Sequence, residues 1–359
     1  MIITQTIEMF IAAYRELNAR MIFWLAIVLN LVAVAMFATI GNNSEGLTIL
    51  HWTIEFQMLS TTWFTPAQFY LLVFYNVGIA IWLTWIATIL ALVSTSTIFP
   101  DMVIPGSVET LVSKPISRWR LFLTRYLTGM LFVLVQVSIL AFGCWLVIGI
   151  RGSSWQPTIF LSIPIVLAFF SYLFCVCALI GVITRSTIAS LLLTILFWFL
   201  LFCVNITEAS LQMIRVNRDL TVESLVLELD EYREKDPEDQ RADRIASLED
   251  ELAERRESQE TWHLVTDIAF SVKTVLPKTD ETIELLERNL VPDELIFRPR
   301  DDDENEEMYT SDRVNRRQIQ RRMVEERRGR SVGWILGTSF AFEAVILLIA
   351  MGLFARRDY

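Results

Sequence analysis

Long apolar runs constrain the fold of this chain more than any other feature of its sequence. Several windows of more than about 18 residues contain almost no charged side chain, which soluble proteins seldom show. An α-helix of about 20 apolar residues is long enough to cross the hydrocarbon core of a bilayer. We therefore expect an all-α polytopic membrane protein with six transmembrane helices, at residues 21–40, 68–97, 120–150, 159–183, 188–206 and 332–355.

Charged residues are concentrated in one part of the chain. Of its 41 acidic and 31 basic residues, 33 and 21 lie within residues 207–331. The sequence thus predicts a membrane domain at 1–206, a hydrophilic and mostly helical insert at 207–331, and a last span with its tail at 332–359. The acidic balance belongs to the insert, so it does not indicate an acidic substrate or a nucleic acid.

Two segments outside the spans are expected to lie on the membrane surface. The loop at residues 46–64 is aromatic and nearly uncharged, which favours an interfacial helix over a soluble loop. His51 and Glu55 in that loop are four residues apart, but no third ligand is evident, so we predict no metal site. Before the first span, apolar residues at helical spacing predict an N-terminal amphipathic helix, with its stripe at Ile7, Phe10, Ile11, Tyr14 and Leu17.

The distribution of basic residues indicates the orientation. Six spans place both termini on one side, and a cytoplasmic placement of both leaves only Arg151 in the short outer loops. The basic run Arg321–Arg330 opposes this orientation, although long hydrophilic segments cross a membrane largely regardless of charge. We expect a multi-pass protein of a bacterial inner (plasma) membrane with the insert outside. The basic residues placed inside are Arg15, Arg20, Lys114, Arg118, Arg120, Arg125, Arg185, Arg356 and Arg357.

The loop between the second and third spans combines a short helix with a break. Ser107 can cap a helix that carries Glu109 in its first turn, and Pro115 disfavours a helical conformation at Lys114. Ser117 can then cap the third span. Two interpretations follow from the residues alone. The segment is either a connecting loop whose basic residues set the orientation, or a rigid element that transmits movement to the span.

This segment resembles a known family. The run "GSVETLVSKPISRWRLFLTRYL" is similar to the cytoplasmic segment of ABC-2 type ABC-transporter permeases, nearest to those of the copper-enzyme maturation type. The terminal "LFARRDY" resembles that family's usual ending. The matching positions are Gly106, Glu109, Leu111, Ser113, Lys114, Pro115, Ile116, Ser117, Arg118 and Arg125.

The resemblance implies a coupling helix near residues 107–114 that docks into a separate cytoplasmic ATPase subunit. It also implies a permease that works as a homodimer or heterodimer. The residues expected to bind the ATPase are Gly106, Val108, Glu109, Leu111, Val112, Lys114, Pro115, Ser117 and Arg118.

The chain itself is not expected to hydrolyse ATP. A phosphate-binding loop needs a Lys directly after Gly, and none of the lysines at 114, 235, 273 and 278 follows a Gly. We therefore predict no cofactor and no catalytic residue in this chain, with ATP bound by the partner. A membrane enzyme is disfavoured further because the chain has only two His residues and no recognisable catalytic set.

The first part of the insert predicts a helical hairpin with a coiled-coil seam. Apolar residues are spaced by three and four on both sides of a break at 236–238, where Asp can cap and Pro can begin a helix. Such a short, polar hairpin is expected to pack against a copy of itself or a partner. The seam residues are Val222, Leu225, Leu229 and Tyr232 on one side, and Ile245, Leu248 and Leu252 on the other.

The second part of the insert predicts two more helices separated by a turn at Pro277. The apolar group at 262–270 belongs to the first of them. The acidic cluster at 299–307 could hold a hard cation, but it lacks the ligand spacing and turn glycine of a calcium loop. A solvated linker facing the basic helix at 313–330 is the favoured interpretation.

Glu343 is a carboxylate inside the last predicted span. An ionisable group within a membrane is costly, so it is a candidate functional residue. The alternative is a packing role in which Glu343 pairs with Asn30, Asn76 or Gln136, the other strongly polar residues of the spans. Both interpretations stay open from the sequence.

Three functions follow as expectations. The first is a permease subunit that couples ATP hydrolysis by a partner to export or extraction of a substrate. The second is a mechanical transmitter, in which the insert acts on an extracytoplasmic partner and nothing crosses the membrane. The third is a membrane scaffold or receptor. The sequence does not identify a substrate.

Overall fold

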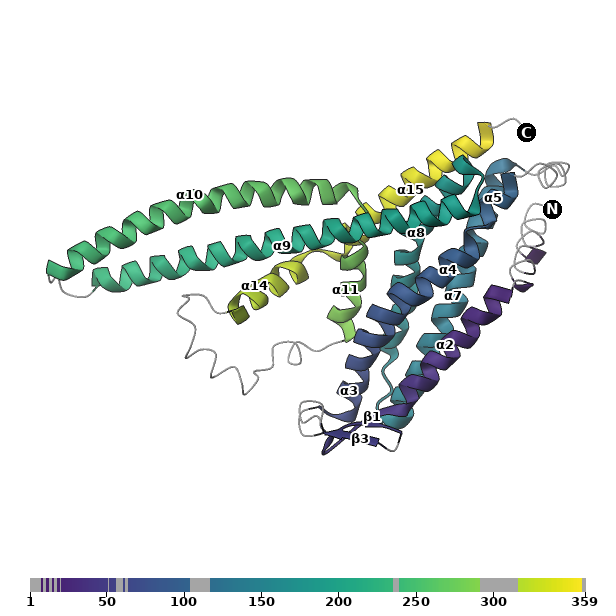
Figure 1. Cartoon of the computed structure of the whole chain (residues 1–359), viewed down its shortest axis with the longest axis horizontal. Coiled ribbons are helices and arrows are strands. Elements are labelled where there is room, and N and C mark those ends of the chain that lie inside the picture. The colour runs from purple at the N-terminus through teal and green to yellow at the C-terminus, as the bar shows by residue number, and fades with distance from the viewer. Residues whose placement is uncertain are drawn as a thin grey trace. The chain divides into compact units, whose positions relative to one another are not determined.

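The structure is a computed structural model in which helices predominate (Figure 1). It describes residues 21–50, 52–55, 64–103, 117–234, 239–290 and 316–356, together with residues 8, 11, 12, 15, 18, 19 and 61. Most of the predicted N-terminal amphipathic helix and the whole acidic cluster at 299–307 lie outside the described residues.

Six helical segments within the described part of the chain are long and apolar enough to cross a membrane, which confirms the predicted polytopic helical architecture. Their positions agree with the predicted spans, except that the fifth is far longer. The segments are Met21–Thr39, Pro66–Met102, Arg118–Arg151, Pro157–Thr184, Thr187–Arg233 and Val332–Arg356.

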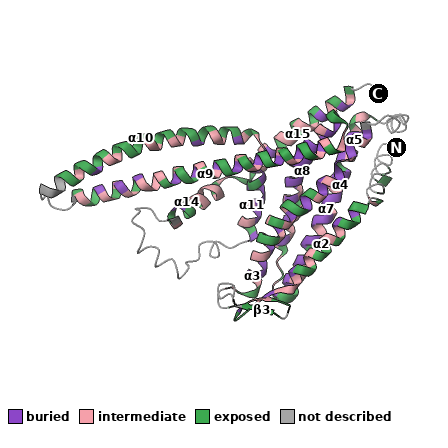
Figure 2. Ribbon diagram, in the orientation of Figure 1, coloured by how far each residue is buried: buried purple, intermediate pink, exposed green. Residues whose placement is uncertain are grey.

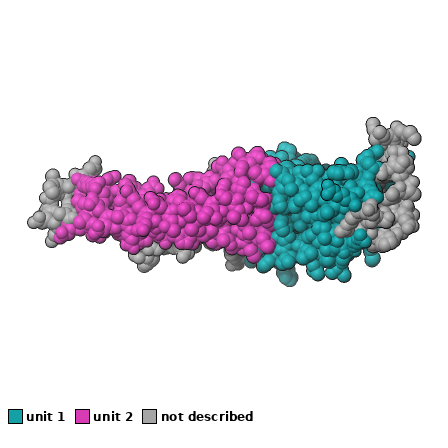
Figure 3. All heavy atoms as spheres, turned by 90° about the horizontal axis from the view of Figure 1, so that it is seen from above, with its two compact units in different colours: residues 1–199, 277–292, 339–359 teal, residues 200–276, 293–338 magenta. Residues whose placement is uncertain are grey.

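Contacts divide the chain into two compact units (Figure 3). Unit 1 comprises Met1–Phe199, Pro277–Pro292 and Ser339–Tyr359. Unit 2 comprises Leu200–Leu276 and Asp293–Thr338. The sequence instead predicts one continuous insert at 207–331.

The second span consists of successive helical pieces. Helix α3 (Pro66–Val73) begins with a capping box, because Gln68 N–H donates to Thr65 Oγ1 at 3.4 Å and Thr65 N–H donates to Gln68 Oε1 at 3.1 Å. A π-helix, η2 (Phe74–Ala87), follows. The remaining pieces are α4 (Thr88–Thr95) and α5 (Ile98–Val103).

The core of unit 1 is formed around α8. Helix α7 (Arg118–Arg151) packs against α8 (Ser162–Thr184), which follows the short 3₁₀ turn η3 (Pro157–Leu161). Helix α8 is the most buried of the candidate spans (Figure 2). A Cβ atom at Gly129 of α7 would lie 2.5 Å from the Phe174 ring of α8, so glycine permits the close approach of these two helices.

The loop after the first span contains a three-stranded antiparallel sheet, and the prediction of an interfacial helix there is wrong for residues 46–50 and 52–55. Helix α2 (Met21–Thr39) is followed by β1 (Ile40–Asn43), β2 (Gly46–Ile49) and β3 (Trp52–Glu55), joined by two-residue turns. The β-branched residues of β2 and β3 favour strands, and the turns allow neighbouring strands to satisfy each other's backbone groups. Composition alone suggested the membrane surface and did not distinguish strand from helix.

Helix α9 (Thr187–Glu234) continues without interruption past residue 206, where the fifth span was expected to end. The composition changes from apolar to charged at that point, but the backbone remains helical. No proline or glycine occurs in α9, so nothing in the sequence stops the helix.

The predicted hairpin is present in unit 2. Helix α10 (Asp239–Val275) pairs with α9, and Leu225, Leu229 and Leu248 form a buried cluster flanked by Tyr232 and Leu252. Two ion pairs show the antiparallel register, since Arg244 meets Glu228 at 3.0 Å and Arg233 meets Glu249 at 2.7 Å. The turn at 235–238 lies outside the described residues.

Of the two further helices predicted after the hairpin, only the second is a helix of its own, because the first is the end of α10. The apolar group at 262–270 is part of α10, whereas α11 (Thr279–Leu290) follows the predicted turn at Pro277. Helix α11 packs against α8, η2 and η3 of unit 1. Tyr75 Oη donates to Glu287 Oε2 at 2.9 Å, and Lys278 N–H donates to Ser339 Oγ at 2.9 Å. This part of the predicted hydrophilic insert therefore lies against the candidate spans.

The chain continues into a basic helix and the last span. Helix α14 (Arg316–Gly329) belongs to unit 2, and α15 (Val332–Arg356) begins there and continues into unit 1.

Candidate functional site

The predicted ATPase-binding segment is only partly described. Gly106, Val108, Glu109, Leu111, Val112, Lys114 and Pro115 lie outside the described residues. Ser117 occupies the N-cap position of α7 as predicted, with its carbonyl accepting from Leu121 N–H at 3.2 Å. The cap is made by the backbone alone, because no hydrogen bond joins the Ser117 side chain to the helix.

Arg118 links the beginning of α7 to the end of α15. Its guanidinium NH1 donates to the carbonyl oxygen of Ala355 at 3.1 Å. One turn further along α7, the ring of Phe122 has its centroid 6.0 Å from that of Phe354, the residue before Ala355. A cation at a helix C-terminus also interacts favourably with the helix dipole. Two spans that are far apart in the sequence are thus joined at the end of α7 that follows the predicted coupling helix.

Glu343 lies between two hydroxyl groups from neighbouring spans. Tyr126 Oη on α7 donates to Glu343 Oε1 at 2.8 Å, and Ser171 Oγ on α8 donates to Oε2 at 2.7 Å. Each carboxylate oxygen therefore has a donor, which offsets part of the cost of removing the group from water. We call these three residues the hydroxyl–carboxylate cluster.

The predicted amide partners of Glu343 have other roles, and that pairing hypothesis is wrong for Asn30 and Asn76. Asn30 Oδ1 accepts from Trp82 Nε1 at 2.8 Å, and Asn76 Nδ2 donates to the Leu72 carbonyl at 2.9 Å. Gln136 is buried, and its Nε2 has no hydrogen-bond partner. The amides were selected by polarity alone, whereas the partners actually used are hydroxyls on the helix faces that meet α15.

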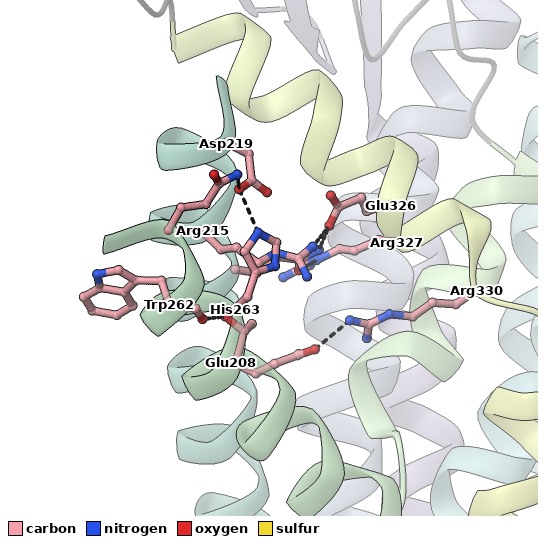
Figure 4. Close-up of polar contacts among 11 residues, drawn as sticks. Glu208, Arg215, Asp219, Trp262, His263, Glu326, Arg327 and Arg330 are labelled. Carbon is pink, nitrogen blue, oxygen red and sulfur yellow. Dashed lines mark hydrogen bonds and ion pairs between the residues drawn. The ribbon is translucent and has the colours of Figure 1, made fainter. Parts of the chain in front are cut away.

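A second polar cluster holds unit 2 together (Figure 4). Glu208 on α9 forms ion pairs with Lys273 on α10 and with Arg330, the latter at 2.7 Å. Glu208 and Lys273 are each only 4% exposed. One carboxylate thus joins α9, α10 and the segment before α15 in a buried environment.

Two more polar layers follow along α9. Glu326 on α14 accepts hydrogen bonds from Gln212, at 3.1 Å, and from Arg215 on α9. Asp219 accepts from Gln259 at 2.7 Å and lies 2.9 Å from His263, both on α10. Helix α14 therefore contacts α9 within unit 2 through Glu326 and through Arg327, whose Nε donates to Gln212 Oε1 at 3.4 Å.

The aromatic residues of unit 2 lie beside cations. The Arg330 guanidinium is 5.1 Å from the centroid of Phe270, which stacks on Trp334 with centroids 5.2 Å apart and an interplanar angle of 10°. Arg218 lies 5.6 Å from the centroid of Trp262. These cation–π pairs place aromatic rings and arginines at the same levels of unit 2.

The polar cluster is structural in its chemistry. The described residues contain no group of three or more His, Cys, Asp and Glu side chains that could hold a metal ion. Glu208 pairs with cations of α10 and of the segment between α14 and α15, which suits a group that fixes helix register.

The sequence singled out Glu343 but not its two hydroxyl partners, and it did not single out Glu208 at all. The partners of Glu343 carry no charge and do not stand out among the many hydroxyls of the spans. Glu208 was one of 33 acidic residues in the predicted insert. Its position in the sequence was the available signal, because Glu208 directly follows the apolar part of α9 and precedes the strongly charged part of the helix.

Comparison with known proteins adds no relative. No protein-family model, no curated protein and no solved structure matches the chain. The described helices define a multi-pass helical membrane protein. The features that bear on its function are the predicted coupling segment and the geometry of the two polar clusters.

Removing the Glu208 charge should destabilise unit 2 far more than removing an exposed one. Glu208→Gln removes the carboxylate that Lys273 and Arg330 share, and breaking a buried ion pair costs about 3–5 kcal/mol. Glu249→Gln is the matched control, since Glu249 and Arg233 are half exposed and such pairs contribute about 1 kcal/mol or less. Hydrogen exchange along α9 and α10 measures both losses. Equal, small effects would contradict a structural role for Glu208.

Glu343→Ala should lower the stability of unit 1 by about 1–3 kcal/mol, because the Tyr126 and Ser171 hydroxyls lose the carboxylate as an acceptor and retain only the backbone carbonyls of Ser171 and Ala168. Glu343→Gln should retain the fold, since an amide can accept from one hydroxyl and donate to the other. Val345→Ala, at a 55% exposed position of the same helix, serves as the control. Thermal unfolding of the purified protein in detergent measures all three. A Gln variant that unfolds like the Ala variant would show that the charge itself is required.

Proposed function

We propose that this chain is the transmembrane subunit of an ABC transporter, and that a separate cytoplasmic ATPase drives it to export or extract a substrate. The observation that carries the proposal is the sequence from Gly106 to Arg125, which resembles the coupling segment of ABC-2 type permeases. Six candidate spans and the start of α7 directly after this segment are compatible with it.

The contacts of Arg118 support a route for coupling. A push on the segment before α7 acts on α7 directly and on α15 through the Arg118–Ala355 hydrogen bond and the Phe122–Phe354 contact. Packed cores respond to such pushes by moving elements as units, because close-packed interiors transmit strain. The proposed site therefore includes Arg118 as a link between two spans as well as a residue facing the ATPase.

The proposal includes a set of partners. The permease would act as a homodimer or heterodimer in a bacterial plasma membrane, with both termini in the cytoplasm and the helical hairpin outside. ATP would be bound by the ATPase subunit, and this chain would carry no catalytic residue.

A second function is favoured by α9. This helix has 48 residues, so at 1.5 Å per residue it is about 72 Å long, more than twice the thickness of a bilayer's hydrocarbon core. Its hydrogen bonding continues from the apolar part into the hairpin. A helix of this kind transmits rotation or tilt along its axis, which supports a mechanical transmitter that acts on an extracytoplasmic partner without moving a substrate.

The first function predicts that a P-loop ATPase copurifies with the protein after gentle solubilisation. Glu109→Arg should abolish this association, because it reverses the charge at the proposed docking helix. The matched control is Glu254→Arg, the same charge reversal at an exposed position of α10, and it should leave the association unchanged. Mass spectrometry of the purified complex identifies the ATPase. Its absence from the wild-type preparation would overturn the proposal.

The mechanical function predicts that ATP changes the hydrogen-exchange protection of α10 in the wild-type complex. Insertion of two glycines after Ser210 should abolish that change while the ATPase still copurifies, because glycines disrupt the helix and absorb its motion. A matched insertion of two alanines keeps the helix intact and should preserve the response. If ATP leaves the exchange of α10 unchanged in the wild type, the mechanical function is wrong.

A further inference from the structure

The burial pattern reverses along the α9–α10 hairpin. In its distal part, Leu225, Leu229 and Leu248 are buried and the charged residues are exposed, as expected for a hairpin in water (Figure 2). In its proximal part, Glu208, Gln212, Thr266 and Lys273 are buried instead. The two parts of one hairpin are thus built for different surroundings.

The exposed residues of the proximal part are large and apolar. The contacts of Glu208 with Lys273 and of Asp219 with His263 place the two helices side by side over this stretch. We call its exposed apolar residues the proximal apolar surface. They are Ile206 and Met213 on α9, 50% and 52% exposed, and Leu264, Ile268, Val272 and Val275 on α10, 57–72% exposed.

The surface is a stripe on each helix. On α10 its residues follow one another at spacings of four, four and three, so they lie on one helical face. On α9, Ile206 and Met213 are seven residues apart and continue a stripe that begins in the apolar part of the helix at Leu192, Leu196 and Phe199. Those earlier residues are 57–60% exposed and lie on the candidate span. The apolar stripe therefore runs along one face of α9 from the candidate span into the proximal part of the hairpin.

The length of α9 agrees with this continuity. Residues 187–213 form about 40 Å of helix, close to the thickness of a bilayer with its headgroup regions. The cation–π pairs Arg330–Phe270 and Arg218–Trp262 lie at this level of the hairpin. Tryptophan and arginine with an apolar neighbour are typical of the membrane interface.

We infer that the proximal part of the hairpin, residues 206–213 and 264–275, contacts the lipids of the outer leaflet. The ligand of this surface is a phospholipid layer at the depth of the headgroups and the first acyl carbons. Asp267 and Ser271 are exposed beside the stripe, which fits the headgroup region and not the hydrocarbon centre. The inference requires that α9 spans the membrane, rests on the proposed orientation for the choice of leaflet, and is independent of any transported substrate.

Lipid immersion also accounts for the interior of this region. A medium of low dielectric constant raises the free energy of an unpaired charge and strengthens the attraction between paired charges. Glu208 meets this condition with two cationic partners, and Gln212 with Glu326 and Arg327. The polar side chains turn toward each other while the apolar side chains turn outward.

Spin labels at single cysteines test the inference in vesicles of phosphatidylcholine and phosphatidylglycerol. The labelled variants are Ile268→Cys and Val272→Cys, in a Cys203→Ser background because Cys203 is exposed, whereas Cys144, Cys175 and Cys177 are buried. Leu227→Cys, at a 66% exposed position of the distal part, is the reference for water, and Leu196→Cys is the reference for lipid. Leu264→Cys replaces either test variant that fails to fold.

Collision rates with oxygen and with a water-soluble nickel chelate distinguish the outcomes. We expect the ratio of oxygen to nickel collisions at 268 and 272 to be severalfold higher than at 227 and to approach the value at 196. A nickel-dominated result at 268 and 272 would show exposure to water and overturn the inference. Low collision rates with both reagents, together with spin–spin broadening, would show that a second copy covers the surface, which also overturns it.

Discussion

The continuous backbone hydrogen bonding of α9 is the constraint on which the rest of the structure depends. A bilayer offers no water to an open peptide group, so a segment that enters it has to satisfy its own backbone. Helix α9 does so from Thr187 to Glu234, with no proline or glycine to stop it. Because the helix does not end where the apolar composition ends, the hairpin, its partner α10 and the ion pairs of Glu208 are all attached to a span.

The two polar clusters solve the same physical problem in different ways. In the hydroxyl–carboxylate cluster, one carboxylate accepts from two neutral donors on α7 and α8. In unit 2, one carboxylate faces two cations. Neutral donors suit a position inside a span, where an extra charge is expensive, whereas a cation pair suits a position close to the interface.

The sequence predicted what depends on local pattern. The spans followed from apolar length, and the hairpin core followed from the spacing of Leu225, Leu229 and Leu248. It did not predict the sheet at 40–55, because the aromatic composition of that loop is equally compatible with a helix at the surface. It also did not predict that α11 packs against α8, or that Tyr126 and Ser171 meet Glu343. Those contacts depend on which helix faces meet in three dimensions, and the identity of a single residue does not show this.

The close approach at Gly129 has a consequence for motion inside unit 1. A single methyl group there would collide with the Phe174 ring, so α7 and α8 already lie at their smallest separation and interlock through aromatic rings, with Tyr126 stacked 5.0 Å from Phe174. Two helices packed in this way move as one rigid body. Rearrangements of the bundle then have to move α7 and α8 together, with α2 packed against α7 and α15 joined to both through Glu343.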